Sequence, residues 1–236
     1  MARFPSLTAI ATLLLLAMNI HAEEPKVPQN VLLKPTFLLA NESWSGGTAF
    51  LVRVIDKPET MMVTCHHLFG PATGRSQQMS PEEIARGLCG AVGLSMQDRR
   101  TIVVSQTYLK VINARATDKM GAEKDVALFV VQADKLSTLH FSDRVPNVGD
   151  TVYLFARLRS ETEPKLFRAT IAEASDNWLM YTFADTGIDL HGTSGAPVLD
   201  EKGDVVGMNV GGGEQNGHVN GIANPTKSIR AAISSK

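Results

Sequence analysis

Residues 192–198 read Gly-Thr-Ser-Gly-Ala-Pro-Val, a serine between two glycines with a proline just beyond. In such a tight turn the Ser194 hydroxyl can project, and the backbone N–H groups of Gly192 and Ser194 can converge on one point. Acyl transfer requires this arrangement, because negative charge develops on the carbonyl oxygen under attack. Ordinary loops also contain such turns, so the rest of the chain must supply the other reacting groups.

A serine nucleophile needs a general base, and the base needs an acid that orients it. His67 follows the apolar run 61–63, and Asp125 opens the apolar run 125–131. A carboxylate at the head of a buried strand is costly unless it is paired, and a histidine N–H is a suitable partner. The sequence therefore predicts that His67 accepts the proton of Ser194 and that Asp125 orients His67.

Three segments resemble those of the trypsin/chymotrypsin-like serine proteases. Thr64-Cys65-His66-His67 is similar to the family's Thr-x-x-His, Asp125-Val126-Ala127-Leu128 to its Asp-(Ile/Val/Leu)-Ala-Leu, and residues 192–197 to its Gly-x-Ser-Gly-Gly-Pro. The order of the three segments is also the family's. The resemblance extends over about residues 36–231 and is closest to bacterial members such as HtrA-type proteases and glutamyl endopeptidases.

The resemblance also bears on two alternatives. His66 adjoins His67 and could be the base, but the Thr-x-x-His spacing selects His67. Asp118 could be the acid, but its polar surroundings indicate a loop and favour Asp125. Thr193 stands where digestive members carry an aspartate that pairs with a newly cut N-terminus, so the active site is expected to form without such a cut.

The resemblance implies an all-β fold of two antiparallel six-stranded β-barrels with a short C-terminal helix. Short runs rich in Val, Leu, Tyr and Phe, separated by Gly, Pro, Asn and Asp, fit this architecture. Ser80-Pro81-Glu82-Glu83 predicts the start of another helix, from its N-cap serine, its proline and its glutamate. The expected organisation is a lead-in at 23–35, a first barrel at 36–142 with an insertion at 70–100, and a second barrel with the terminal helix at 143–236. The expected strands are 48–55, 61–65, 101–114, 125–132, 151–158, 166–174, 178–183, 196–199, 204–210 and 219–223.

The substrate pocket is expected between the segment before Ser194 and the strands at 205–212 and 221–223, which resemble the family's pocket walls. Ile188 stands where trypsin-type enzymes place an aspartate, although Asp189 is only one residue later. Asn209 stands where glutamyl endopeptidases carry a histidine that recognises glutamate. The expected lining predicts a preference for an apolar or small side chain. It consists of Ile188, Asp189, His191, Asn209, Val210, Gly211 and Gly212.

Residues 1–22 have the pattern of a secretory signal peptide, with Arg3, an apolar run at 8–20 and a small residue at Ala22. The protein is therefore expected to be secreted or periplasmic, without stable membrane insertion after cleavage; an uncleaved anchor is the alternative. The chain of 236 residues has a formal net charge of −1 at pH 7, which gives no electrostatic case for nucleic acid.

Two cysteines, Cys65 and Cys89, are the whole cysteine content. In an oxidising compartment they are expected to form a disulfide, with two buried free thiols as the alternative. Cys65 precedes two histidines, but consecutive residues of a strand point to opposite faces, so no metal site is expected. No cofactor is expected either.

Together these features predict an exported serine endopeptidase that cleaves protein or peptide substrates through an acyl-enzyme. Two alternatives remain. The chain could be a catalytically inactive protease fold that binds a partner in the cell envelope, or it could be a serine esterase.

Overall fold

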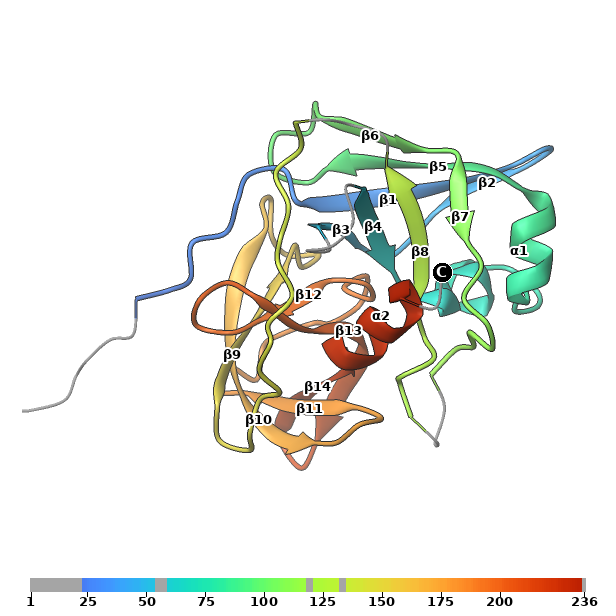
Figure 1. Cartoon of the computed structure of the whole chain (residues 1–236). Coiled ribbons are helices and arrows are strands. Elements are labelled where there is room, and N and C mark those ends of the chain that lie inside the picture. The colour runs from blue at the N-terminus through green and yellow to red at the C-terminus, as the bar shows by residue number, and fades with distance from the viewer. Residues whose placement is uncertain (1–22, 54–58, 118–120, 132–134, 235–236) are drawn as a thin grey trace, which may run out of the picture.

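The computed structural model describes residues 23–53, 59–117, 121–131 and 135–234 (Figure 1). The expected signal peptide at 1–22 and the alternative acid Asp118 lie outside the described residues. The fold is mostly β, with two barrel-like sheets formed one after the other along the chain, which confirms the predicted class.

The first sheet has eight strands in the order β6-β5-β1-β3-β4-β8-β7, with β2 paired to β1. All pairs are antiparallel, and the sheet curls until β6 approaches β8. The expected six strands are therefore wrong for this barrel. The strands are β1 (Leu32–Leu39), β2 (Ser43–Ser45), β3 (Ala49–Arg53), β4 (Thr60–Thr64), β5 (Leu88–Ser95), β6 (Ile102–Ser105), β7 (Thr107–Leu109) and β8 (Ala127–Val131).

Strands β1 and β5 occupy segments in which no strand was expected. β1 begins within the expected lead-in at 23–35, and β5 lies within the expected insertion at 70–100. β5 pairs with both β1 and β6, so it is a central part of the first sheet. The expected strand at 101–114 is divided into β6 and β7.

The second sheet closes into a six-stranded barrel in the order β10-β11-β14-β13-β12-β9, as predicted. Its alternating burial along β11 is that of a strand with one face toward a core. The strands are β9 (Thr151–Ala156), β10 (Lys165–Ala174), β11 (Leu179–Phe183), β12 (Pro197–Leu199), β13 (Val205–Gln215) and β14 (His218–Pro225).

The described residues form two α-helices beside the barrels, and the sequence predicted both. α1 (Pro81–Gly87) begins at Ser80, whose side chain accepts from the N–H of Glu83 while the Glu83 carboxylate accepts from the N–H of Ser80. This reciprocal pair satisfies two donors that a helix start leaves free. α2 is Thr226–Ser234. Two short 3₁₀-helices, η2 (His66–Phe69) and η3 (Pro71–Thr73), follow β4.

The connection between the barrels is bound to both of them. Leu139 forms a parallel bridge with Val52 of β3, and Phe141 forms one with Val205 of β13. α2 fastens the same segment, because the Arg230 guanidinium donates to the carbonyl oxygen of Phe141 at 2.9 Å. The barrels are therefore held in a fixed relation by backbone hydrogen bonds.

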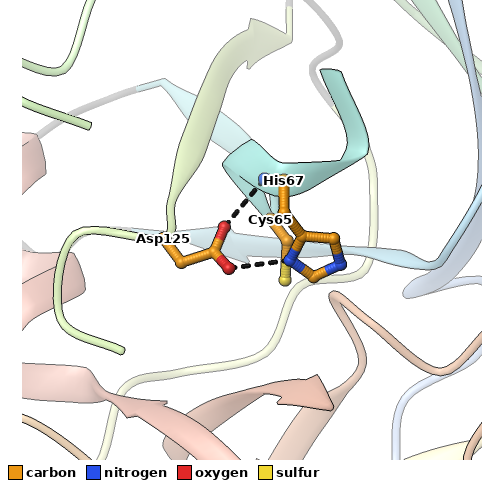
Figure 2. Close-up of side chains that lie close together, drawn as sticks. All are labelled: Cys65, His67 and Asp125. Carbon is orange, nitrogen blue, oxygen red and sulfur yellow. Dashed lines mark hydrogen bonds and ion pairs between the residues drawn. The ribbon is translucent and has the colours of Figure 1, made fainter. Parts of the chain in front are cut away.

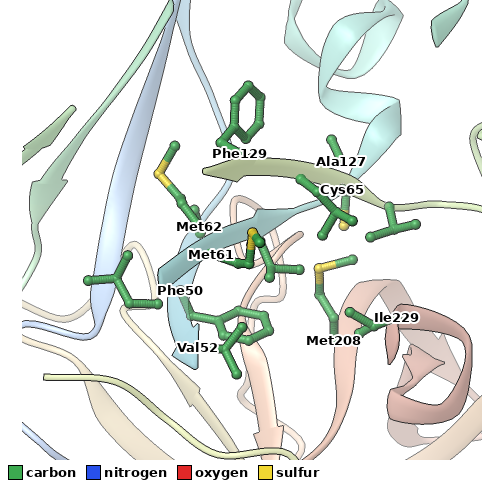
Figure 3. Close-up of a cluster of buried hydrophobic side chains, with 14 of the residues drawn as sticks. Phe50, Val52, Met61, Met62, Cys65, Ala127, Phe129, Met208 and Ile229 are labelled. Carbon is green, nitrogen blue, oxygen red and sulfur yellow. The ribbon is translucent and has the colours of Figure 1, made fainter. Parts of the chain in front are cut away.

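A continuous apolar core lies where the two barrels and α2 meet (Figure 3). Cys65 and Ala127 of the first half lie there with Met208 of β13 and Ile229 of α2. All four are fully buried. Within the described residues, none of the helices is long and apolar enough to span a bilayer.

Candidate active site

The pairing of β4 with β8 brings His67 and Asp125 together. The strands are antiparallel, and Thr64 at the end of β4 lies opposite Ala127 at the start of β8. Residues just after β4 therefore meet residues just before β8. η2 then turns the chain so that both the N–H and the ring of His67 face the carboxylate (Figure 2).

Four hydrogen bonds hold the Asp125 carboxylate. Oδ1 accepts from the His67 N–H at 2.9 Å, and Oδ2 lies 2.7 Å from His67 Nδ1. Oδ2 also accepts from the N–H of Thr117 at 3.0 Å and from its hydroxyl at 2.7 Å. Complete burial raises the pKa of Asp125, but the hydrogen bonds from His67 and Thr117 outweigh this and hold the pKa below its usual value. The carboxylate is thus charged and keeps the His67 ring in one orientation.

His66 is turned away from this pair. It is 1% exposed and lies near Phe69, with a ring-centroid distance of 6.3 Å. Its Nδ1 has no hydrogen-bond partner. Burial lowers the pKa of His66, so the ring is neutral. The adjacent histidines therefore have different environments, and only His67, with a side chain 13% exposed, borders solvent.

Cys65 and Cys89 are both free thiols, so the expected disulfide is wrong. Cys65 points into the core between the barrels, where Sγ donates to the carbonyl oxygen of Asn209 at 3.3 Å. Cys89 is exposed on β5. A disulfide requires the two Cβ atoms to face each other at close range, which these opposed positions prevent.

The Sγ of Cys65, a ring nitrogen of His67 and an oxygen of Asp125 lie within 4.8 Å of one another (Figure 2). Such a group could in principle hold a metal. Burial raises the pKa of the Cys65 thiol well above its usual value, and the Asp125 charge raises it further. The thiol is therefore protonated, whereas a metal-binding cysteine is a thiolate. Hydrogen bonds already occupy the carboxylate and thiol, and we assign no metal to them.

The loop that carries Ser194 is held between the barrels. The N–H of Thr48, just before β3, donates to the carbonyl oxygen of Ser194 at 2.7 Å, and the Thr48 hydroxyl donates to that of Gly192 at 3.0 Å. From the other side, the N–H of Gly195 donates to the carbonyl oxygen of Asn209 at 2.7 Å. The loop's position therefore depends on both barrels.

Gly195 cannot be replaced without moving this loop. Its φ is +91°, and a Cβ added there would lie 1.9 Å from the carbonyl oxygen of Thr48 and 2.7 Å from the hydroxyl oxygen of Thr64. Only glycine combines that backbone conformation with so close an approach. The second glycine of the Gly-Thr-Ser-Gly segment is thus required by the contact between the loop and the first barrel.

The Ser194 hydroxyl donates to the carbonyl oxygen of Val210 at 3.4 Å. Val210 itself lines the cleft that His67 borders. In the described part of the chain no direct hydrogen bond joins the side chains of Ser194 and His67. Catalytic hydrogen bonds are often long or misaligned before substrate binds.

The N–H groups of Gly192 and Ser194 donate to no acceptor within the described residues. The N–H between them, on Thr193, is used inside the loop and donates to the carbonyl oxygen of Leu190 at 3.1 Å. Two donors beside the serine are therefore available to an oxygen atom of a bound molecule.

A buried polar network supports the loop from below, and sequence reasoning did not find it. The Asn209 side-chain amide lies 2.7 Å from the hydroxyl of Tyr181 and 2.8 Å from that of Thr193. All three residues are essentially inaccessible to solvent. Digestive members of the family carry at the position of Thr193 an aspartate that needs an ion-pair partner. Thr193 is uncharged, and the neutral network fixes its side chain. The resemblance drew attention to Asn209 as a pocket residue. Tyr181 is distant from it in sequence, and no motif indicated that the two side chains meet.

The expected pocket residues occupy three different environments. Ile188 and Asn209 are buried, and Asn209 is fully so. Asp189 and His191 are exposed and are hydrogen bonded to each other. The remaining residues line a cleft of about 430 Å³ together with His67; they are Val210, Gly211 and Gly212.

The space expected to receive a substrate side chain is narrowed by the chain's own side chains. The Tyr181 ring lies over Gly221, where an added Cβ would come within 2.2 Å of Cζ. Leu190 lies against Gly212, where an added Cβ would come within 2.7 Å of Cδ1. The side chains of Tyr181 and Leu190 therefore lie directly against the backbone of β14 and β13 at these two glycines.

A second cleft, of about 560 Å³, lies on the other side of the serine loop. Gly46 and Gly47, between β2 and β3, line it together with Gly192. The two clefts share Ala72 as a lining residue, so they are neighbouring parts of one surface.

The family model that matches this chain is described as a trypsin-like peptidase domain and covers residues 47–208. No significant match was found among curated proteins. Three solved structures illustrate the likeness of fold. The active form of the Rv3671c protease from M. tuberculosis has a TM-score of 0.57 and 14% identity, over 87% of this chain and 80% of that one.

The serine endoprotease from Yersinia pestis has a TM-score of 0.58 and 15% identity, over 89% of this chain and 67% of that one. A Glu endopeptidase in complex with MPD has a TM-score of 0.57 and 14% identity, over 89% of this chain and 91% of that one.

Proposed function

The chain belongs to the family of trypsin-like peptidase domains, and as a member of it is a serine endopeptidase; on this premise we propose that it is exported and cleaves peptide bonds through His67, Asp125 and Ser194. Ser194 is the nucleophile, His67 the general base and Asp125 the group that orients the base. The N–H groups of Gly192 and Ser194 form the oxyanion hole. Water then releases the acyl-enzyme.

The observation that carries this proposal is the bonding of Asp125. A fully buried carboxylate is costly, and it is kept charged here by hydrogen bonds from His67 and Thr117. With Nδ1–H directed to Asp125, Nε2 of His67 has the lone pair that accepts a proton. When His67 becomes positively charged during the reaction, the nearby negative charge stabilises it.

The oxyanion hole is supported by the two unused N–H donors beside the serine hydroxyl. As Ser194 attacks the scissile carbonyl, the carbonyl oxygen gains negative charge and becomes a stronger acceptor for these donors. Each such donor is worth roughly 3 kcal/mol in the transition state. The contacts of the loop with Thr48 and Asn209 hold the donors in place before substrate arrives.

We further propose that the residue before the scissile bond is small. The side chains of Tyr181 and Leu190 lie directly against the backbone of β14 and β13, and Ile188 adds an apolar wall. A glutamate preference is not supported, because Asn209 is fully buried and bonded to Tyr181 and Thr193. The proposed site of action is the periplasm or the exterior of the cell.

A fluorophosphonate probe tests the proposed nucleophile, because the probe labels only an activated serine with a formed oxyanion hole. The unmodified protein should be labelled at Ser194 and should hydrolyse a denatured protein substrate. Ser194→Ala and His67→Ala should each lower kcat by ~10⁶, and Asp125→Asn by ~10⁴. Ser160→Ala, at an exposed turn, is the matched control and should leave both readouts unchanged.

Peptide hydrolysis that survived in Ser194→Ala would contradict the assignment of the nucleophile. Folded protein that takes up no label would instead favour an inactive protease fold that binds a partner. Turnover of esters but not of peptides would favour an esterase.

A further inference from the structure

Three positively charged side chains line the second cleft, beside the serine loop. They are Lys34 of β1 and Arg157 and Arg159, which follow β9. Lys34 and Arg157 are half-buried and Arg159 is exposed. Side chains from two barrels, more than a hundred residues apart in sequence, therefore bring positive charge to one wall of the cleft.

No carboxylate forms a close ion pair with this cluster. Among the described residues, none lies within 4 Å of the charged nitrogens of Lys34, Arg157 or Arg159. Asp189 is near enough to feel the cluster, because hydrogen bonds from His191 lower the pKa of Asp189 and the charge of Arg159 lowers it further. The one acidic side chain in the lining, Glu161, is paired with Lys165.

The positive charges also act on one another. Burial lowers the pKa of Lys34, and the charges of Arg157 and Arg159 lower it further. Like charges gathered in a partly desolvated cleft repel each other, and an anion bound among them removes that repulsion. Arginine is especially suited to this, because its planar group can donate two parallel hydrogen bonds to one carboxylate.

The cluster lies close to the proposed reaction centre. Lys34 Nζ donates to the carbonyl oxygen of Gly47 at 3.2 Å, and the next N–H along the chain, that of Thr48, donates to the carbonyl oxygen of Ser194. Gly192 is itself part of the lining. A substrate held at Ser194 can therefore reach the cluster within a few residues of its scissile bond.

The positions of the two clefts indicate which side of the scissile bond meets the positively charged cluster. The first cleft is lined by His67 and by Val210, Gly211 and Gly212 of β13, the strand that walls the proposed acyl-side pocket. The second cleft lies beyond Gly192 and contains none of these residues. The part of the substrate that departs with the amine must then lie in the second cleft.

We propose that Lys34, Arg157 and Arg159 bind a carboxylate of the substrate on the C-terminal side of the scissile bond, so that the enzyme prefers acidic residues there. This inference rests on the proposed endopeptidase function and adds a substrate class to it. The ligand is an aspartate or glutamate side chain, or the terminal carboxylate of a short peptide.

The test uses two peptides that share a sequence cleaved by the unmodified protein and differ only by Glu or Gln at the second residue after the cut. A digest of a denatured protein first supplies that sequence. The Glu peptide should have a kcat/KM about tenfold higher at low salt, and the ratio should shrink toward one in ~1 M salt.

The combined variant Lys34→Gln, Arg157→Gln and Arg159→Gln should bring the ratio near one without salt. If the triple variant folds poorly, the double variant Arg157→Gln and Arg159→Gln can be used instead, because it retains Lys34, which is half-buried on β1. It should give an intermediate ratio. Arg168→Gln, an exposed arginine of β10 outside the cleft, is the matched control and should keep the full ratio. A nitrophenyl ester has no residue on the departing side, so its turnover should be the same in every variant.

A blocked C-terminus on the Gln peptide separates the two forms of ligand: if amidation lowers its kcat/KM, the terminal carboxylate also binds. Equal rates for the Glu and Gln peptides in the unmodified protein, with both cleaved, would overturn this inference alone. A preference that persisted in the triple variant would do the same. Failure of the unmodified protein to cleave any peptide would overturn the proposed function and this inference with it.

Discussion

His66 and His67 are neighbours in the chain, yet they differ in what surrounds each ring. His67 is hydrogen bonded to Asp125 and borders the cleft, whereas His66 is buried with an unpartnered Nδ1. The sequence distinguished the two only through their distance from Thr64. The physical difference comes from η2, which turns successive side chains to different sides of the short helix.

The buried state of His66 predicts an acid-sensitive stability. Its pKa is lowered in the folded protein, so below the unfolded value of ~6.5 the unfolded chain binds more protons than the folded chain. This contribution to stability is complete above pH ~6.5 and is lost as the pH falls from there toward the folded pKa.

His66→Gln removes this titration. Relative to the variant, the unmodified protein should show a falling unfolding temperature as the pH is lowered from about 6.5 to 5. Thermal unfolding followed by circular dichroism at several pH values measures the difference. Parallel curves for the two proteins over that range would contradict the prediction. His218→Gln, at an exposed histidine, is the control.

At the scale of elements, the sequence predicted those parts that have strong local signals. The capping pattern at 80–83 located α1, and the apolar runs before His67 and after Asp125 located β4 and β8. Because those two strands pair, His67 at the end of one meets Asp125 at the start of the other. β1 and β5 were missed because each carries residues that are rare in strands, Pro35 in one and two glycines in the other.

The pocket and the cysteines were harder to predict, since both depend on contacts between distant segments. Only the folded chain shows that Tyr181 of β11 reaches Asn209 of β13 and lies against the backbone of β14. Likewise, nothing in the spacing of Cys65 and Cys89 reveals that one side chain faces the core and the other faces solvent.

The turn at Gly195 provides a test of the serine loop as an element. Gly195 and Gly149 both have a φ of +91°, but only Gly195 has neighbours within reach of an added Cβ. Gly149→Ala should therefore cost about 1 kcal/mol of stability, the strain of the left-handed conformation alone. Gly195→Ala should cost ~3 kcal/mol or more, because the loop must also move away from Thr48.

Urea unfolding of both variants measures these costs, and probe labelling at Ser194 reports the position of the loop. Labelling should be lost in Gly195→Ala and retained in Gly149→Ala. Equal costs in the two variants would show that the close contact with the first barrel does not exist in solution.

At the scale of the whole molecule, no disulfide cross-links the described part of the chain. Under non-denaturing conditions a thiol reagent should modify one cysteine rapidly, Cys89, while Cys65 reacts only after unfolding. The unfolding temperature should be the same with and without a reducing agent. A native protein with no reactive thiol, together with a drop in stability on reduction, would contradict the free-thiol assignment. Cys89→Ser is the control, since it should abolish the rapid reaction and leave the fold unchanged.

The position of α2 has a consequence for how the molecule is made. Its Ile229 and Ile233 belong to the same core as the strands of the first barrel, and Figure 3 shows Ile229 beside that core. A ribosome produces those strands early, but it makes α2 only after every strand of both barrels. The first barrel therefore cannot complete its core as it emerges, in contrast to domains that fold in order during synthesis. We therefore expect the growing polypeptide to stay incompletely packed until translation has passed residue 233.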